Sequence, residues 1–167
     1  MAFITWHSGN VPSNLEIKQV YGVVFTKDCR ILLRIEDGKY QLTGGKPEPF
    51  DNDMEATLKR EMLEEVNVAI GKAYIVGYQL VNEEDDSEPY AQVRMTAMIE
   101  NIGGQQPDPD NGRIYGRLLT TPTKAVKLLN WGKVGNKLIF EATEIIKQMF
   151  NIKIFSNDDT LIDCEVD

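Results

Sequence analysis

The sequence runs Gly44-Gly45-Lys46-Pro47-Glu48 and, soon afterwards, Arg60-Glu61-Met62-Leu63-Glu64-Glu65-Val66-Asn67-Val68. The second stretch predicts a helix on which Glu61, Glu64 and Glu65 share an arc of about 100°. Like charges at this spacing repel one another, so such a group either faces water or holds a cation. Mg²⁺ prefers oxygen ligands and is often shared with substrate phosphates. Together with the glycine loop before it, the helix therefore predicts one half of a metal–diphosphate site.

The alternative interpretation is an ordinary charged helix face in water. Glu55 and Lys59 form an i,i+4 pair on the predicted helix, and so do Arg60 and Glu64. Pairs of this kind are common on helix surfaces and add little stability. The glycine loop and its spacing from the carboxylates favour the metal site over this alternative.

The same residues resemble the Nudix box, the signature of hydrolases that cleave a nucleoside diphosphate linked to another group. The usual box reads Gly, five residues, Glu, seven residues, Arg-Glu, an aliphatic residue, any residue, Glu-Glu, any residue, Gly and an aliphatic residue. The sequence differs from the usual box in three ways. Asp51 replaces the first Glu, eight residues instead of seven separate it from Arg60, and Asn67 replaces the last Gly. Residues 45–68 match the box at Gly45, Arg60, Glu61, Met62, Glu64, Glu65 and Val68.

This resemblance implies an α/β fold, an α/β/α sandwich around a mixed β-sheet. It also implies hydrolysis of a diphosphate linkage in a nucleoside triphosphate or a nucleoside-diphosphate derivative, with Mg²⁺ as cofactor and Mn²⁺ as a substitute. Because the box is altered, a nucleotide-binding or regulatory module without strong catalysis is the alternative. The implied catalytic residues are Arg60, Glu61, Glu64 and Glu65, and the implied metal ligands are Glu61, Glu64, Glu65 and, as a weaker contributor, Asp51.

Substrate contacts are less strongly encoded. Gly44 and Gly45 let the backbone approach a phosphate because they lack a Cβ atom, and Lys46 follows them. Trp131 lies between two predicted helices, where it either stacks on a base or covers the core. Arg94 lies on a strand that is expected to line the cleft. Two acidic residues in the loop 103–112 are candidate extra metal ligands, namely Asp108 and Asp110.

The composition of the chain limits the classes of partner that it is expected to bind. The net charge of −8 argues against binding to a nucleic-acid backbone, but it allows a small phosphorylated substrate, for which a nucleotide is expected. No apolar run approaches the roughly 20 residues of a membrane helix, so no membrane partner is expected. The N-terminus has no signal-peptide pattern, and Cys29 and Cys164 fit no metal spacing. We expect a cytoplasmic protein; whether it forms a homodimer is left open.

The remaining pattern predicts one domain over residues 1–167, rich in strands. We expect an N-terminal arm at about 1–14, a helix that begins at the N-cap Asn52, and an acidic, loosely ordered tail at about 156–167. Strands are expected at 17–26, 30–35, 40–43, 73–82, 90–100, 113–119 and 152–155, and the later helices at about 121–129 and after Gly135. This order of strands and helices suits a mixed sheet with helices on both faces.

Overall fold

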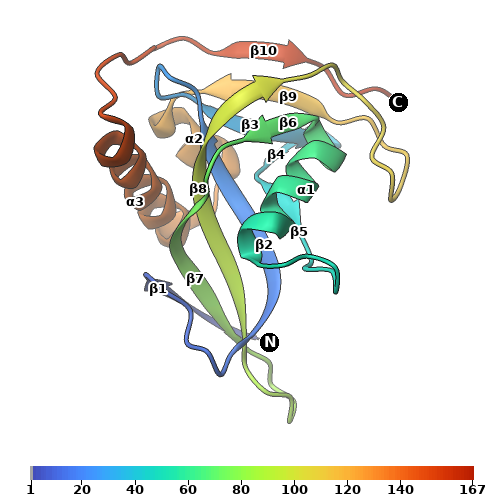
Figure 1. Cartoon of the computed structure of the whole chain (residues 1–167), viewed down its shortest axis with the longest axis vertical. Helices are drawn as coiled ribbons and strands as arrows, with labels where there is room; N and C mark the ends of the chain where they lie inside the picture. The colour runs from blue at the N-terminus through green and yellow to red at the C-terminus, as the bar shows by residue number, and fades with distance from the viewer. Residues whose placement is uncertain (1) are drawn as a thin grey trace.

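The strands of the chain join into one mixed sheet with helices packed on both faces (Figure 1). The computed structural model describes residues 2–167. The elements in chain order are β1 (Phe3–Ser8), β2 (Glu16–Phe25), β3 (Ile31–Glu36), β4 (Lys39–Gln41), β5 (Thr43–Gly45), α1 (Met54–Val66), β6 (Val68–Ile70), β7 (Tyr74–Asn82), β8 (Tyr90–Ile102), β9 (Gly116–Thr120), α2 (Pro122–Leu129), α3 (Gly132–Phe150) and β10 (Thr160–Asp163).

The centre of the sheet is a parallel pair, β2 and β8, in which Tyr21 lies opposite Arg94. All other strand pairs are antiparallel, and the main strand order is β1-β7-β8-β2-β3-β9-β10. The short strand β5 also pairs with β2, where Tyr21 lies opposite Gly44. The glycine loop is therefore attached to the middle of the sheet.

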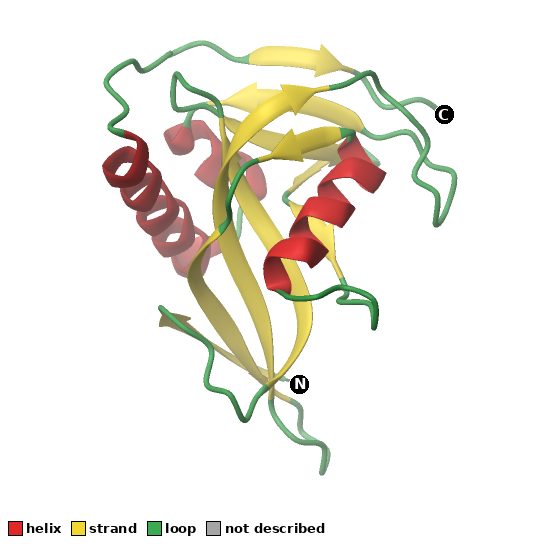
Figure 2. Ribbon diagram, in the orientation of Figure 1, coloured by secondary structure: helices red, strands yellow, loops and turns green. Residues whose placement is uncertain are grey.

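The two sides of β2 face two different cores. Val20 and Val24 pack in the core that includes Leu58 and Met62 of α1. Val23 and its alternate neighbours pack instead in the core that includes buried residues of α2 and α3. Figure 2 shows α1 on one side of the strands and the two later helices on the other. The predicted mixed sheet with helices on both faces is confirmed.

Local sequence explains where α1 begins and ends. Asp53 caps the helix by accepting a hydrogen bond from the Ala56 backbone N–H, so the predicted N-cap at Asn52 is off by one residue. At the other end Asn67 has φ 50° and ψ 49°, the left-handed conformation that favours Gly or Asn. Asn67 thus replaces the glycine of the box without disturbing the helix end.

Both termini are more ordered than the sequence suggested. The expected N-terminal arm, apart from Met1, which lies outside the described residues, contains the edge strand β1 paired with β7. The expected last strand at 152–155 is wrong, because the final strand is β10 at 160–163 and pairs with β9. The tail at 156–167 is not loose, since the Glu165 carboxylate accepts hydrogen bonds from the backbone N–H groups of Asp37 and Gly38. Within residues 2–167, no helix is long and apolar enough to cross a membrane.

Candidate functional site

Arg60 is the hub of the carboxylate cluster on α1. Its Nε donates to Asp51 Oδ1 at 3.0 Å, and its Nη2 donates to Asp51 Oδ2 at 2.9 Å. Asp51 Oδ2 also accepts from the Thr57 hydroxyl at 2.9 Å and from the Glu48 backbone N–H at 2.9 Å. The bonds from Arg60 hold the pKa of the Asp51 carboxyl well below its ordinary value. Asp51 therefore joins the loop to the helix through Arg60.

Two further carboxylates share the same guanidinium. Nη1 of Arg60 donates to Glu61 Oε1 at 2.9 Å and to Glu64 Oε2 at 3.2 Å. Burial raises the pKa of the Glu61 carboxyl, and the charges of Glu64 and Asp110 add to the rise, while Arg60 opposes it. Glu64 is the more open of the two, with its side chain 28% exposed. Glu64 is thus the carboxylate of this pair that solvent and ligands reach more easily.

Glycine is required where the loop passes the helix. A Cβ atom on Gly45 would lie 2.4 Å from Glu61 Oε1, which is closer than non-bonded atoms approach. A Cβ on Gly44 would lie 2.1 Å from the backbone oxygen of Val20. Arg60 Nη2 donates to the backbone oxygen of Lys46 at 3.1 Å and holds the loop from the other side. Gly45 thus lets the backbone lie against the Glu61 carboxylate, and Gly44 lets it lie against β2.

Glu65 points to a different arginine. Its carboxylate forms a buried ion pair with Arg34 of β3, whose guanidinium carbon lies 4.4 Å from the centre of the Tyr115 ring. Arg34 also donates to the side-chain oxygen of Gln41. Sequence reasoning missed Arg34, although an arginine inside the apolar strand Ile31–Glu36 signals a buried charge with a partner.

Of the two acidic residues in the long loop, Asp108 is buried and structural. It accepts hydrogen bonds from the Tyr115 hydroxyl at 3.1 Å and from the Asp110 backbone N–H at 2.9 Å. These bonds fold the loop so that the charge of Asp110 acts on Glu61. Asp110, rather than Asp108, is the candidate that the loop presents to the cluster.

The cluster has the chemistry of a site for a hard cation, but its charges are paired within the protein. Across residues 2–167, no three acidic, histidine or cysteine side chains stand ready-arranged around a metal position. The reason is that Arg60 bonds Asp51, Glu61 and Glu64, and Arg34 pairs with Glu65. The donors themselves fit Mg²⁺, which takes carboxylate and carbonyl oxygens and shares them with phosphate.

Comparisons with solved structures identify the fold. The Bacillus subtilis pyrophosphohydrolase BsRppH superposes with a TM-score of 0.51 and 23% identity, over 61% of this chain and 63% of that one. The E. coli ORF135 protein superposes with a TM-score of 0.53 and 19% identity, over 84% of this chain and 97% of that one. A MutT protein from Bacillus halodurans superposes with a TM-score of 0.52 and 19% identity, over 74% of this chain and 78% of that one. The chain has the Nudix fold.

No family model matches the sequence, and no curated protein sequence matches it either. The matched part of the chain spans under two thirds of the length of BsRppH. At these identities the superpositions establish the fold alone. Within the Nudix fold, the box residues lie on β5, the following loop, α1 and the first residue of β6.

Arg94 and Trp131 are brought together on the side of the Nudix sheet that faces α2 and α3. The guanidinium carbon of Arg94 lies 5.6 Å from the Trp131 ring and 5.1 Å from the Tyr21 ring. These residues line a cavity of about 270 Å³ together with three glutamines. One of the three, Gln41, is the residue that accepts from Arg34. The predicted substrate contacts therefore adjoin the partner of Glu65, whereas Lys46 contributes its backbone oxygen to the carboxylate cluster.

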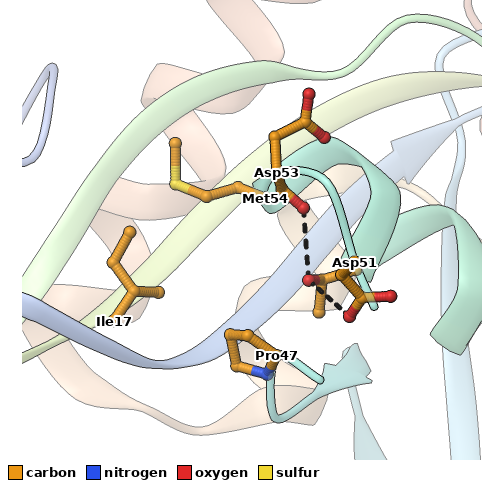
Figure 3. A pocket seen from close by; sticks show the side chains of 6 residues that line it. Ile17, Pro47, Asp51, Asp53 and Met54 are labelled. Carbon is orange, nitrogen blue, oxygen red and sulfur yellow. Dashed lines mark hydrogen bonds between the residues drawn. The ribbon is translucent and has the colours of Figure 1, made fainter. Parts of the chain in front are cut away.

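A second cavity, of about 310 Å³, lies beside the glycine loop (Figure 3). Ile17, Pro47 and Met54 give it an apolar wall, and Asp51 and Asp53 lie at its edge. The Asp51 carboxylate is bonded to Thr57, which also lines the cavity. The lining contains no cationic side chain, so the cavity lacks the chemistry of a phosphate site.

Proposed function

We propose that this protein hydrolyses a diphosphate linkage in a nucleoside triphosphate or nucleoside-diphosphate derivative, with Mg²⁺ or Mn²⁺ as cofactor. The observation that carries the proposal is the packing of Gly45 directly against Glu61, next to Glu64, on a Nudix fold. Backbone and carboxylate oxygens meet there, which is the ligand chemistry that a magnesium ion shared with phosphate requires.

The residues of the cluster would have different roles in binding the cation and in positioning its ligands. Glu61, Glu64 and Glu65 would hold the cation, which when bound neutralises phosphate charge and lowers the pKa of a coordinated water. Arg60 would position Glu61 and Glu64, because one nitrogen of its guanidinium bonds both of them. Asp51 would act through Arg60, since both of its oxygens already accept hydrogen bonds from that side chain.

Glu64 is the best candidate for orienting the attacking water. In residues 2–167 its one hydrogen bond comes from Arg60, and its side chain is the most exposed of the three glutamates on the helix. A carboxylate with free lone pairs can accept a proton from water that attacks phosphorus. Glu61 and Glu65 are more deeply buried, which suits them to binding and positioning.

A panel of nucleotides assayed with Mg²⁺ or Mn²⁺ tests the proposal. Products should be scored for phosphate, pyrophosphate and nucleoside monophosphate, which together identify the bond that is cleaved. We expect metal-dependent release of a phosphate product from at least one nucleoside triphosphate or diphosphate derivative. Cleavage of no nucleotide, alongside cleavage of a non-nucleotide diphosphate, would contradict the substrate class.

A second candidate function is a Nudix module that binds a nucleotide without hydrolysing it. The observation in its favour is that Arg60 already pairs with Asp51, Glu61 and Glu64, so part of their charge is compensated without a metal. A binding module would melt at a higher temperature with nucleotide and leave that nucleotide intact after prolonged incubation with Mg²⁺. An enzyme would convert it.

A further inference from the structure

Three arginines are buried within residues 2–167, and one of them differs from the other two. Arg34 is paired with Glu65, and Arg117 donates two hydrogen bonds to Asp163. Arg94 is only 5% exposed, yet no carboxylate among residues 2–167 forms an ion pair with it. A buried charge without a counter-charge is costly, so its retention points to a partner from outside the chain.

The unused donors of Arg94 lie on one edge of its guanidinium. Nη1 donates to Gln19 Oε1 at 3.0 Å and to the Val93 backbone oxygen at 3.2 Å, and Nη2 donates to Gln79 Oε1 at 3.3 Å. Nε is buried and has no partner. An arginine has five N–H donors, so the Nε–H and one N–H of Nη2 remain. These two nitrogens flank the same edge, which matches a ligand with two adjacent acceptors.

The surroundings of that edge suit a flat ring. Tyr21 and Trp131 line the cavity, and base–aromatic stacking is a common way to bind nucleobases. Gln92 and Gln41 add amide groups to the lining. Burial lowers the pKa of Arg94 to about 10, so the side chain is still charged at neutral pH.

The cavity is also connected to the carboxylate cluster. Gln41 lines it and accepts a hydrogen bond from Arg34, and Arg34 pairs with Glu65. A ligand that fills the cavity therefore lies two side chains away from the α1 carboxylates.

We propose that the cavity lined by Arg94, Tyr21 and Trp131 selects a purine base of the guanine type; that this base belongs to the hydrolysed substrate rests on the proposed function. Guanine and hypoxanthine present two adjacent acceptors, O6 and N7, which pair with two donors of an arginine. Adenine presents a donor beside its N7 acceptor, so one N–H of Arg94 would face another donor. Arg94 is thus the residue that sets the specificity.

Isothermal titration calorimetry with nucleoside monophosphates and inorganic phosphate tests this inference in the full-length protein. We expect GMP and IMP to bind about tenfold or more tightly than AMP, which is the discrimination of one good two-donor contact. The Arg94→Met variant should lose this preference while it stays folded, because the substitution strands no buried carboxylate. A purely structural role for Arg94 would instead leave the preference of the folded variant unchanged.

The Arg94→Lys variant serves as the second test, because it keeps the charge but not the two-donor edge. It should lose the preference for GMP as well. Equal affinity for GMP and AMP in the wild type, a preference that survives both substitutions, or phosphate binding that matches GMP binding would each overturn the inference. Monophosphates contain no diphosphate linkage, so GMP selectivity without any hydrolysis would refute the proposed function alone, and hydrolysis without selectivity would refute this inference alone.

Discussion

The carboxylate cluster on α1 and the cavity around Arg94 have opposite imbalances of charge. In the cluster, four carboxylates (Asp51, Glu61, Glu64 and Glu65) share two guanidiniums, those of Arg60 and Arg34. In the cavity, the Arg94 guanidinium has no carboxylate partner among residues 2–167. An excess of either sign costs stability, and proteins retain such costs mainly where function needs them. If the proposed function holds, each region would be completed by a different part of one ligand, a metal-bound diphosphate in the first and a base in the second.

The largest effect on the carboxylate side is expected from Glu64→Gln. The change removes one charge from the cluster and leaves the buried pairs of the helix intact, so the fold should survive. If Glu64 binds the cation or accepts the proton of water, activity should fall about a hundredfold or more. Initial rates of phosphate release from the best nucleotide measure this.

A matched control is Glu88→Gln, which removes the same charge from an exposed position in the link between β7 and β8. It should leave the rate unchanged. If the two variants hydrolyse the substrate equally fast, the cluster is not the catalytic centre.

Substituting methionine for each of two buried arginines tests the difference between the two regions through the free energy of unfolding. Arg34→Met leaves Glu65 buried without its partner, and breaking a buried pair in this way costs about 3–5 kcal/mol. Arg94→Met strands no carboxylate and leaves only neutral acceptors without their donor, so its free energy of unfolding should fall by less, about 1–3 kcal/mol. Urea denaturation of both variants, followed by far-UV circular dichroism, measures the difference. Equal losses at the two positions would remove the distinction between the two regions.

A smaller effect on activity is expected from Asp51→Ala. Asp51 reaches the cluster through Arg60, and partners that orient a ligand in this way typically contribute tenfold to a hundredfold. We therefore expect a loss of about tenfold, well below that of Glu64→Gln, measured with the same assay. Losses of the same size in the two variants would instead indicate that Asp51 binds the cation itself.

The smallest effect is expected on the cavity side, from Trp131→Ala. Loss of a stacking face weakens the substrate and the transition state equally, so KM should rise about fivefold while kcat changes little. Steady-state kinetics on a guanine nucleotide separate the two parameters. A fall in kcat at constant KM would show that Trp131 acts on the reacting groups rather than on the base.

The sequence predicted the helix and the loop of the site because both are local. Gly45, Arg60 and the three glutamates lie within 21 residues of one another, and helix periodicity alone places the carboxylates on one side. The N-cap prediction was wrong by one residue, since Asn52 and Asp53 are both good capping residues and the backbone conformation decides between them.

Other features depend on residues far apart in the chain. Glu65 pairs with Arg34 across two strands and a loop, and no short pattern links these positions. The tail is ordered because Asp163 bonds Arg117 and Glu165 bonds the turn at Asp37 and Gly38. An acidic tail resembles a solvated one in the sequence until its cationic and backbone partners are known. The missing counter-charge of Arg94 is likewise visible only when its neighbours are assembled.

Hydrolysis of GTP in ¹⁸O-labelled water, with and without Mg²⁺, tests the central claim most directly. Mass spectrometry of the products from the wild type and from Glu64→Gln locates the label and the rate together. The account predicts metal-dependent turnover by the wild type, with the label in a phosphate product, and little turnover by the variant. Label on the sugar, turnover without a divalent cation, or equal turnover by the two proteins would contradict it.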